Sequence, residues 1–118
     1  MTPDIEGKFL PLPNATLHIL LTLRTGEKHG YAIMGEVEQL SEGRVRLGPG
    51  TLYGAVKRML ADGLIEESDE RPDPALDDER RRYYRVTALG ERVRAAEVDR
   101  LQSLLSRAAG RRPRLREA

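Results

Sequence analysis

Residues 48–67 read GPGTLYGAVKRMLADGLIEE, and this stretch decides the fold. Gly48 and Pro49 are typical of a helix start, because glycine is an acceptable N-cap and proline has the φ that the first helical position needs. The apolar residues that follow recur at helical spacing and predict one buried face: Leu52, Ala55, Val56, Met59 and Leu60. Asp62 and Gly63 then end the helix, and residues 64–67 read as a strand.

The helices and strands predicted on either side of this stretch complete the order of elements. We predict helices over about 14–25, with Asn14 as N-cap, and 29–41, a short strand over 44–47, a returning strand over 82–86 and a long last helix. This order predicts a mainly α fold with a small β-hairpin wing (α+β): a winged helix-turn-helix plus a C-terminal dimerisation helix. The expected domains are a flexible N-terminal arm (1–13), the winged helix-turn-helix DNA-binding domain (14–87), the dimerisation helix (88–109) and a basic tail (110–118).

Composition restricts the class of protein. The chain has 118 residues, one small domain by length, and no cysteine for disulfides or thiolate metal sites. Its apolar runs are too short to span a bilayer, and its start lacks the pattern of a secretory signal. We therefore expect a cytoplasmic protein without a membrane segment.

The net charge of +1 hides an uneven distribution. Residues 61–80 hold 2 basic and 9 acidic side chains, whereas residues 81–118 hold 11 basic and 4 acidic ones. A basic C-terminal third favours a polyanionic partner, although charged helix faces are often merely solvated.

The third helix carries the best candidates for contact with DNA. A helix that packs by one face and shows hydroxyl, phenol and cationic groups on the other suits the major groove, and an ordinary surface helix is the alternative. At its start, Gly50 has no side chain, so backbone N–H groups could approach a phosphate closely. The candidate residues of this helix are Pro49, Gly50, Thr51, Tyr53, Lys57 and Arg58.

Two further groups of residues could contact the DNA backbone. Tyr31 opens the second helix, which crosses the backbone in this fold, and could donate its hydroxyl to a phosphate. Arg80, Arg81 and Arg82 end the wing loop and could reach a phosphate or the minor groove, or could simply be solvated. The acidic run at 77–79 either swings clear of DNA or pairs with these arginines when DNA is absent.

Nothing in the sequence supports catalysis, a cofactor or a metal site. Two histidines without cysteine cannot build a metal site, and the carboxylates lie mostly in the wing loop, where no pair would be held in fixed geometry.

The apolar stripe of the last helix runs for more turns than one small core would cover. Pairing with a second copy would bury it, and folding back on the same domain is the alternative. The candidate dimerisation residues are Leu89, Val93, Leu101, Leu104 and Leu105.

Four motifs together resemble the PadR family of transcriptional regulators. They are HGYAI (29–33), GTLY (50–53), DGLI (62–65) and RRYYRVT (81–87) with Gly90, and the resemblance covers about residues 14–109. The single last helix resembles the short subfamily. The resemblance implies a homodimeric regulator, usually a repressor, that binds a palindromic double-stranded DNA operator and is released by a small molecule or another signal. The alternative is a winged-helix interaction module that binds a protein partner through its acidic wing and no longer binds DNA.

Overall fold

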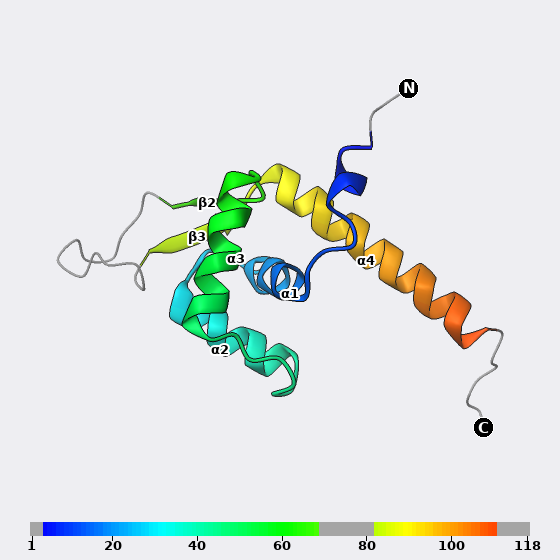
Figure 1. The fold of residues 1–118 in the computed structure, drawn as a ribbon, viewed down its shortest axis with the longest axis horizontal. Coiled ribbons are helices and arrows are strands. Elements are labelled where there is room, and N and C mark those ends of the chain that lie inside the picture. The colour runs from blue at the N-terminus through cyan, green and yellow to red at the C-terminus, as the bar shows by residue number, and fades with distance from the viewer. Residues whose placement is uncertain (1–3, 69–81, 111–118) are drawn as a thin grey trace.

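The fold of the chain in the computed structural model is a helical domain with a small sheet at one side and a long helix leaving the other (Figure 1). The structure describes residues 4–68 and 82–110. In chain order the elements are η1 (Glu6–Phe9), α1 (Asn14–Leu23), β1 (Lys28–His29), α2 (Gly30–Leu40), α3 (Pro49–Ala61), β2 (Ile65–Glu67), β3 (Tyr83–Val86) and α4 (Ala88–Ala109). The predicted fold class, mainly helical with a β-hairpin wing, is confirmed.

One hydrophobic core joins α1, α2, α3, the hairpin and the first half of α4. The most deeply buried side chains include Ile19, Leu20, Ile33, Val37, Leu52, Met59, Leu64, Ile65 and Val93. The predicted apolar face of α3 is buried as expected, with the exception of Leu60, which is 37% exposed. Leu60 stands last in that stripe and lies against the cleft described below, so solvent reaches it.

The sheet corrects one sequence prediction. Its strand order is β1-β3-β2 and both pairs are antiparallel, with Lys28 opposite Tyr84 and Glu67 opposite Tyr84 on the other side. The first strand is therefore residues 28–29, and the predicted strand at 44–47 is wrong. Those residues form a loop in which the Ser41 hydroxyl accepts from the Val45 N–H at 2.9 Å.

Hydrogen bonds to and from Thr87 hold the junction between the wing and α4. The Thr87 hydroxyl caps α4 by accepting from the Gly90 N–H at 3.0 Å and donates to the Gly63 carbonyl oxygen at 2.6 Å. The Thr87 N–H in turn donates to the Leu64 carbonyl oxygen at 3.0 Å. These bonds fix the direction in which α4 leaves the hairpin.

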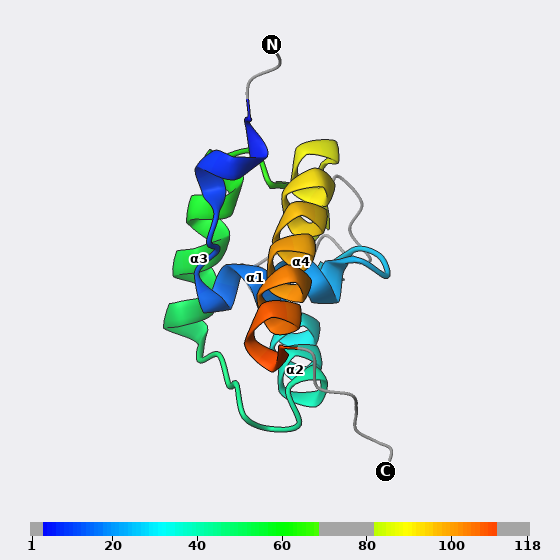
Figure 2. The ribbon, with the colours of Figure 1, turned by 90° about the vertical axis from the view of Figure 1, so that its right-hand side faces the viewer.

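The N-terminal residues also differ from expectation. Residues 4–13 were predicted to form a flexible arm, but they pack along α4, where η1 lies beside the helix (Figure 2). Arg92 donates to Glu6 at 2.9 Å, and the Leu12 N–H donates to the Glu97 carboxylate at 2.9 Å. The start of α1 differs too: Pro13 occupies the N-cap position and Asn14 is already helical.

Glu97 is the buried charge that holds this segment on α4. Its side chain is 2% exposed and pairs with Arg100, whose Nε lies 2.6 Å from Glu97 Oε1. The hydrogen bond from Arg100 lowers the pKa of the Glu97 carboxyl below its usual value, with help from the Leu12 N–H and against the opposing effect of burial.

Replacing Glu97 with glutamine is expected to lower the free energy of unfolding by about 1–3 kcal/mol, because the amide removes the charge that Arg100 faces. Since the folded pKa is depressed, the carboxylate stabilises the fold fully above its unfolded pKa and loses this effect as pH falls through the folded pKa. Urea unfolding at neutral and acidic pH should show the difference between parent and variant shrinking in acid. Glu38→Gln, which removes the charge from the exposed pair with Arg46, is the control and should cost less.

None of the helices within residues 4–68 and 82–110 is long and apolar enough to cross a membrane.

Candidate nucleic-acid interface

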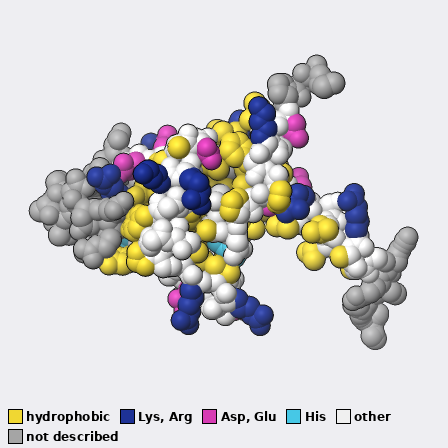
Figure 3. All heavy atoms as spheres, viewed as in Figure 1, with side chains coloured by type: hydrophobic (Ala, Val, Ile, Leu, Met, Phe, Trp, Pro, Cys, Tyr) yellow, Lys and Arg dark blue, Asp and Glu magenta, His cyan; other side chains and the backbone are white. Residues whose placement is uncertain are grey.

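The solvent side of α3 presents most of its predicted contact residues. Thr51, Lys57 and Arg58 are exposed, while Leu52 and Val56 on the opposite side are buried. Basic side chains gather over α3 and the neighbouring base of the wing in the space-filling view (Figure 3). The helix therefore offers one hydroxyl and two cations on a surface that the core holds in place.

The start of α3 is open to a ligand. Pro49 and Gly50 are exposed, and a Cβ added to Gly50 would meet nothing within 4 Å. The first N–H groups of a helix lack intrahelical partners and carry the positive end of its dipole. An anion such as a DNA phosphate could therefore approach this turn closely.

Tyr53 lies differently from the prediction. Its side chain is half-buried, and its hydroxyl lies against Gly30, so close that a Cβ at Gly30 would overlap it. The phenol thus packs α3 onto the start of α2 instead of facing solvent. We correct its assignment from a DNA contact to a residue that positions α3.

The start of α2 is fixed by His29, the first residue of the HGYAI motif. Its Nδ1 accepts from the Ala32 N–H at 3.2 Å, and its ring meets the Tyr83 ring edge-on at 5.3 Å. This cap leaves Tyr31, on the first turn of α2, 50% exposed. Its role as a contact with the DNA backbone stays a prediction.

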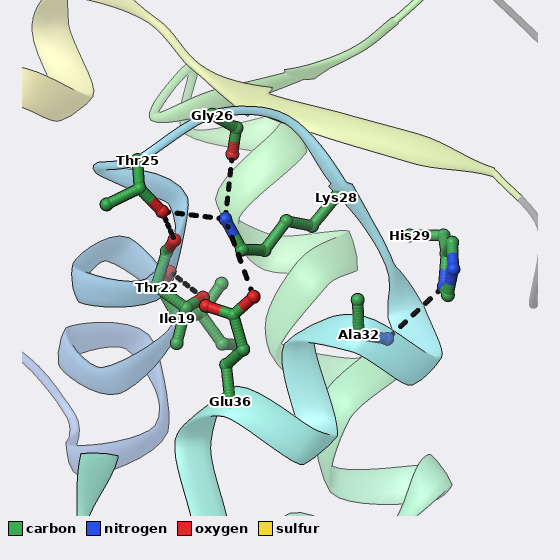
Figure 4. Close-up of polar contacts among 8 residues, drawn as sticks. All are labelled: Ile19, Thr22, Thr25, Gly26, Lys28, His29, Ala32 and Glu36. Carbon is green, nitrogen blue, oxygen red and sulfur yellow. Dashed lines mark hydrogen bonds and ion pairs between the residues drawn. The ribbon is translucent and has the colours of Figure 1, made fainter. Parts of the chain in front are cut away.

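Lys28 is a second positioning residue, and no local pattern marks it. Its ammonium group donates to Thr25 Oγ1 at 2.8 Å and lies 3.7 Å from a Glu36 carboxylate oxygen, with its side chain 11% exposed (Figure 4). The contact joins the turn after α1 to α2. A buried lysine of this kind serves the helix-turn-helix frame and is not a free cation for DNA.

Of the three arginines predicted at the end of the wing loop, Arg82 is the one that lies within the described residues. Arg82 precedes β3 and pairs with Glu67, with 3.4 Å between Arg82 Nε and Glu67 Oε2. The two side chains, with Lys57, Leu60 and other residues of α3 and β3, line a cleft of about 250 Å³ between α3 and the wing. Arg80, Arg81 and the acidic run at 77–79 lie outside the described residues.

The predicted dimerisation residues divide into two groups along α4. Val93 is fully buried in the chain's own core and Leu89 packs against that core, so assigning Val93 to a contact between copies is wrong. Leu104 and Leu105 are 52% and 68% exposed, and Leu101 is half-buried. The face buried within the chain uses Gly90, Val93 and Glu97; every described residue from 102 onward is exposed.

Within the described part of the chain, no three His, Asp or Glu side chains lie where they could hold a metal ion.

Comparison with known proteins agrees with this geometry. The family model described as "Transcriptional regulator PadR-like family" matches residues 19–96, from α1 into α4. The transcriptional regulator Rv3488 of Mycobacterium tuberculosis (strain ATCC 25618 / H37Rv) is 34% identical over 94 residues, covering 80% of this chain and 81% of that protein.

Two more similarities differ in what they cover. An uncharacterized 37.1 kDa protein in transposon TN4556 of Streptomyces fradiae is also 34% identical over 94 residues, but this chain covers only 25% of its length. A PadR family transcription regulator from hypervirulent Clostridium difficile R20291 has the same fold, with a TM-score of 0.62 at 24% identity. That likeness covers 83% of this chain and 100% of the other.

Proposed function

This chain belongs to the PadR-like family of transcriptional regulators, which bind DNA, and on that premise we propose that it is a repressor that binds a palindromic operator as a homodimer. The observation that carries the proposal is the exposed face of α3, which bears a hydroxyl and two cations. The opposite, apolar face of the helix is buried in the core and holds it in place. Family membership also disfavours the alternative of a module that binds only proteins.

In the proposed complex, α3 enters the major groove. Thr51 and Arg58 would face base edges or nearby phosphates, and the open start of α3 at Gly50 would receive a phosphate. Lys57 and Arg82 would contact the sugar-phosphate backbone from the two sides of the cleft. Arg80 and Arg81, next to Arg82 in the sequence, would extend this contact along the wing.

Exposed leucines on α4 support the homodimer. The helix leaves the domain and extends away from the other elements (Figure 1), and Leu104 and Leu105 lie on this extension with most of their surface in solvent. Exposed leucines on a protruding helix are buried most simply by the same helix of a second copy. A two-fold dimer would place two α3 helices for the two halves of a palindrome. The proposal includes release of the operator by a small molecule or another signal.

Alanine substitutions on α3 test which residues read DNA. Thr51→Ala is expected to weaken operator binding by about 1–3 kcal/mol, because a lost polar contact to a base reduces discrimination. Lys57→Ala should weaken binding to all sequences and lower the salt slope by about one unit, because one phosphate contact is lost. Fluorescence anisotropy with labelled duplexes measures both effects.

The matched control is Lys8→Ala, an exposed lysine on η1 away from α3. It removes the same charge and should leave affinity and salt slope unchanged. If Thr51→Ala and Lys57→Ala bind like Lys8→Ala, α3 is not the DNA-reading helix.

A further inference from the structure

The cleft between α3 and the wing holds two cations and a carboxylate. Lys57 reaches it from α3, and Glu67 and Arg82 reach it from the hairpin. Glu67 is opposite Tyr84 in the β2–β3 register, so both side chains lie on the side of the sheet that faces α3. A phosphate that approached Lys57 along the exposed side of α3 would therefore meet Arg82 and Glu67 as well.

The same hairpin carries a second ion pair between an arginine and a glutamate on its other side. Arg85 Nε donates to Glu66 Oε2 at 2.8 Å, and these residues alternate with Glu67 and Tyr84 along their strands. Glu66 and Arg85 are absent from the residues that line the cleft. Their ion pair, at 2.8 Å, is shorter than the 3.4 Å pair of Glu67 and Arg82. The hairpin thus provides its own internal control.

We propose that Glu67 limits the affinity of this protein for DNA by competing with a DNA phosphate for Arg82. The inference rests on the proposed DNA-binding function and assigns a role to a carboxylate that the sequence analysis did not select. For Arg82 the described partner is a carboxylate on β2, whereas the acidic run at 77–79 lies outside the described residues.

The competition follows from exposure and charge. The Arg82 and Glu67 side chains are 46% and 32% exposed, so their ion pair is weak enough for a phosphate to displace. Once Arg82 turns to the phosphate, the Glu67 carboxylate faces a like charge across the cleft. Both effects lower the affinity for any DNA sequence, because phosphates carry no sequence information.

Glu67→Gln tests the inference, because the amide keeps the size of the side chain and removes its charge. Against a labelled duplex of mixed sequence, about 24 base pairs long to accommodate two half-sites, the variant should bind more tightly than the parent. The expected gain is about three- to tenfold at low salt, with a salt slope more negative by up to about one unit. DNA from upstream of the protein's own gene should gain the same factor, so that selectivity is unchanged.

Glu66→Gln is the matched control, and Arg82→Ala supplies the second background. Glu66→Gln should bind within about twofold of the parent, since its pair faces away from α3. In the Arg82→Ala background, Glu67→Gln should lose most of its effect, because the contested guanidinium is gone. Thermal unfolding of each variant checks that the hairpin is intact.

The outcomes separate the two proposals. If the parent binds DNA but Glu67→Gln binds it no more tightly than Glu66→Gln does, the role of Glu67 is overturned and the proposed function stands. If Glu67→Gln gives the same gain in DNA affinity in the Arg82→Ala background, the role of Glu67 is also overturned. If the parent and the Glu67→Gln variant both fail to bind either duplex, the proposed function fails and this inference fails with it.

Discussion

Replacing Gly90 with alanine is expected to lower the free energy of unfolding by about 3 kcal/mol or more. A Cβ at Gly90 would overlap the Leu64 carbonyl oxygen and press on a methyl group of Val86. The carbonyl cannot move without cost, because it is backbone and accepts a hydrogen bond from the Thr87 N–H at 3.0 Å. Urea denaturation followed by circular dichroism measures the loss.

Gly35→Ala is the control for this prediction. Gly35 is also helical, on α2, but a Cβ there would meet nothing within 4 Å. Alanine at that position should stabilise the protein by up to about 1 kcal/mol through helix propensity alone. A Gly90→Ala variant as stable as Gly35→Ala would contradict the close packing at the junction of wing and α4.

The double variant Leu104→Asp with Leu105→Asp is expected to abolish operator binding without unfolding the chain. Both leucines are exposed within one copy, so the single domain should keep its stability. In the proposed dimer they would be buried, and burying two carboxylates without partners costs several kcal/mol. Light scattering should report a monomer, and affinity for the operator should fall by about a hundredfold or more, because the contacts of one half-site are lost.

Ser103→Asp with Ser106→Asp adds the same charge on the other side of α4. These residues are also exposed, and this control should remain dimeric. A Leu104→Asp and Leu105→Asp variant that stays dimeric and binds its operator would show that copies associate through another surface.

Local signals explain what the sequence predicted well. Pro49 starts α3, Thr87 caps α4 and Gly63 ends the turn after α3 with a φ of 79°, as expected from their individual preferences. The exposed face of α3, with Thr51 and Lys57, followed from helical periodicity alone.

The remaining features depend on contacts between distant residues. The two-residue strand β1 exists because it pairs with β3 more than fifty residues later, and no local pattern marks it. Likewise, the packing of residues 4–13 depends on the buried Glu97, 85 residues after Leu12. Periodicity placed Val93 on an apolar stripe, but it could not show whether a second copy or the chain's own core buries that side chain.

Tyr53 shows the same limit at the candidate site. The family motif and the helical period both placed it on α3, yet only the packing of α3 against Gly30 turns its hydroxyl away from solvent. The positions of Thr51, Lys57 and Arg58 needed no such contact, so their exposure could be predicted.

DNase I footprinting on the DNA upstream of the protein's own gene tests the central claim most directly, that α3 of a dimer reads a palindromic operator. The account predicts a protected segment with inverted half-sites about 10 base pairs apart, or a multiple of that distance. Protection should require two chains per site and should disappear when Thr51 and Lys57 are both replaced with alanine. Protection that persists in that double variant, or a parent that protects no segment before it coats the DNA non-specifically, would contradict the claim.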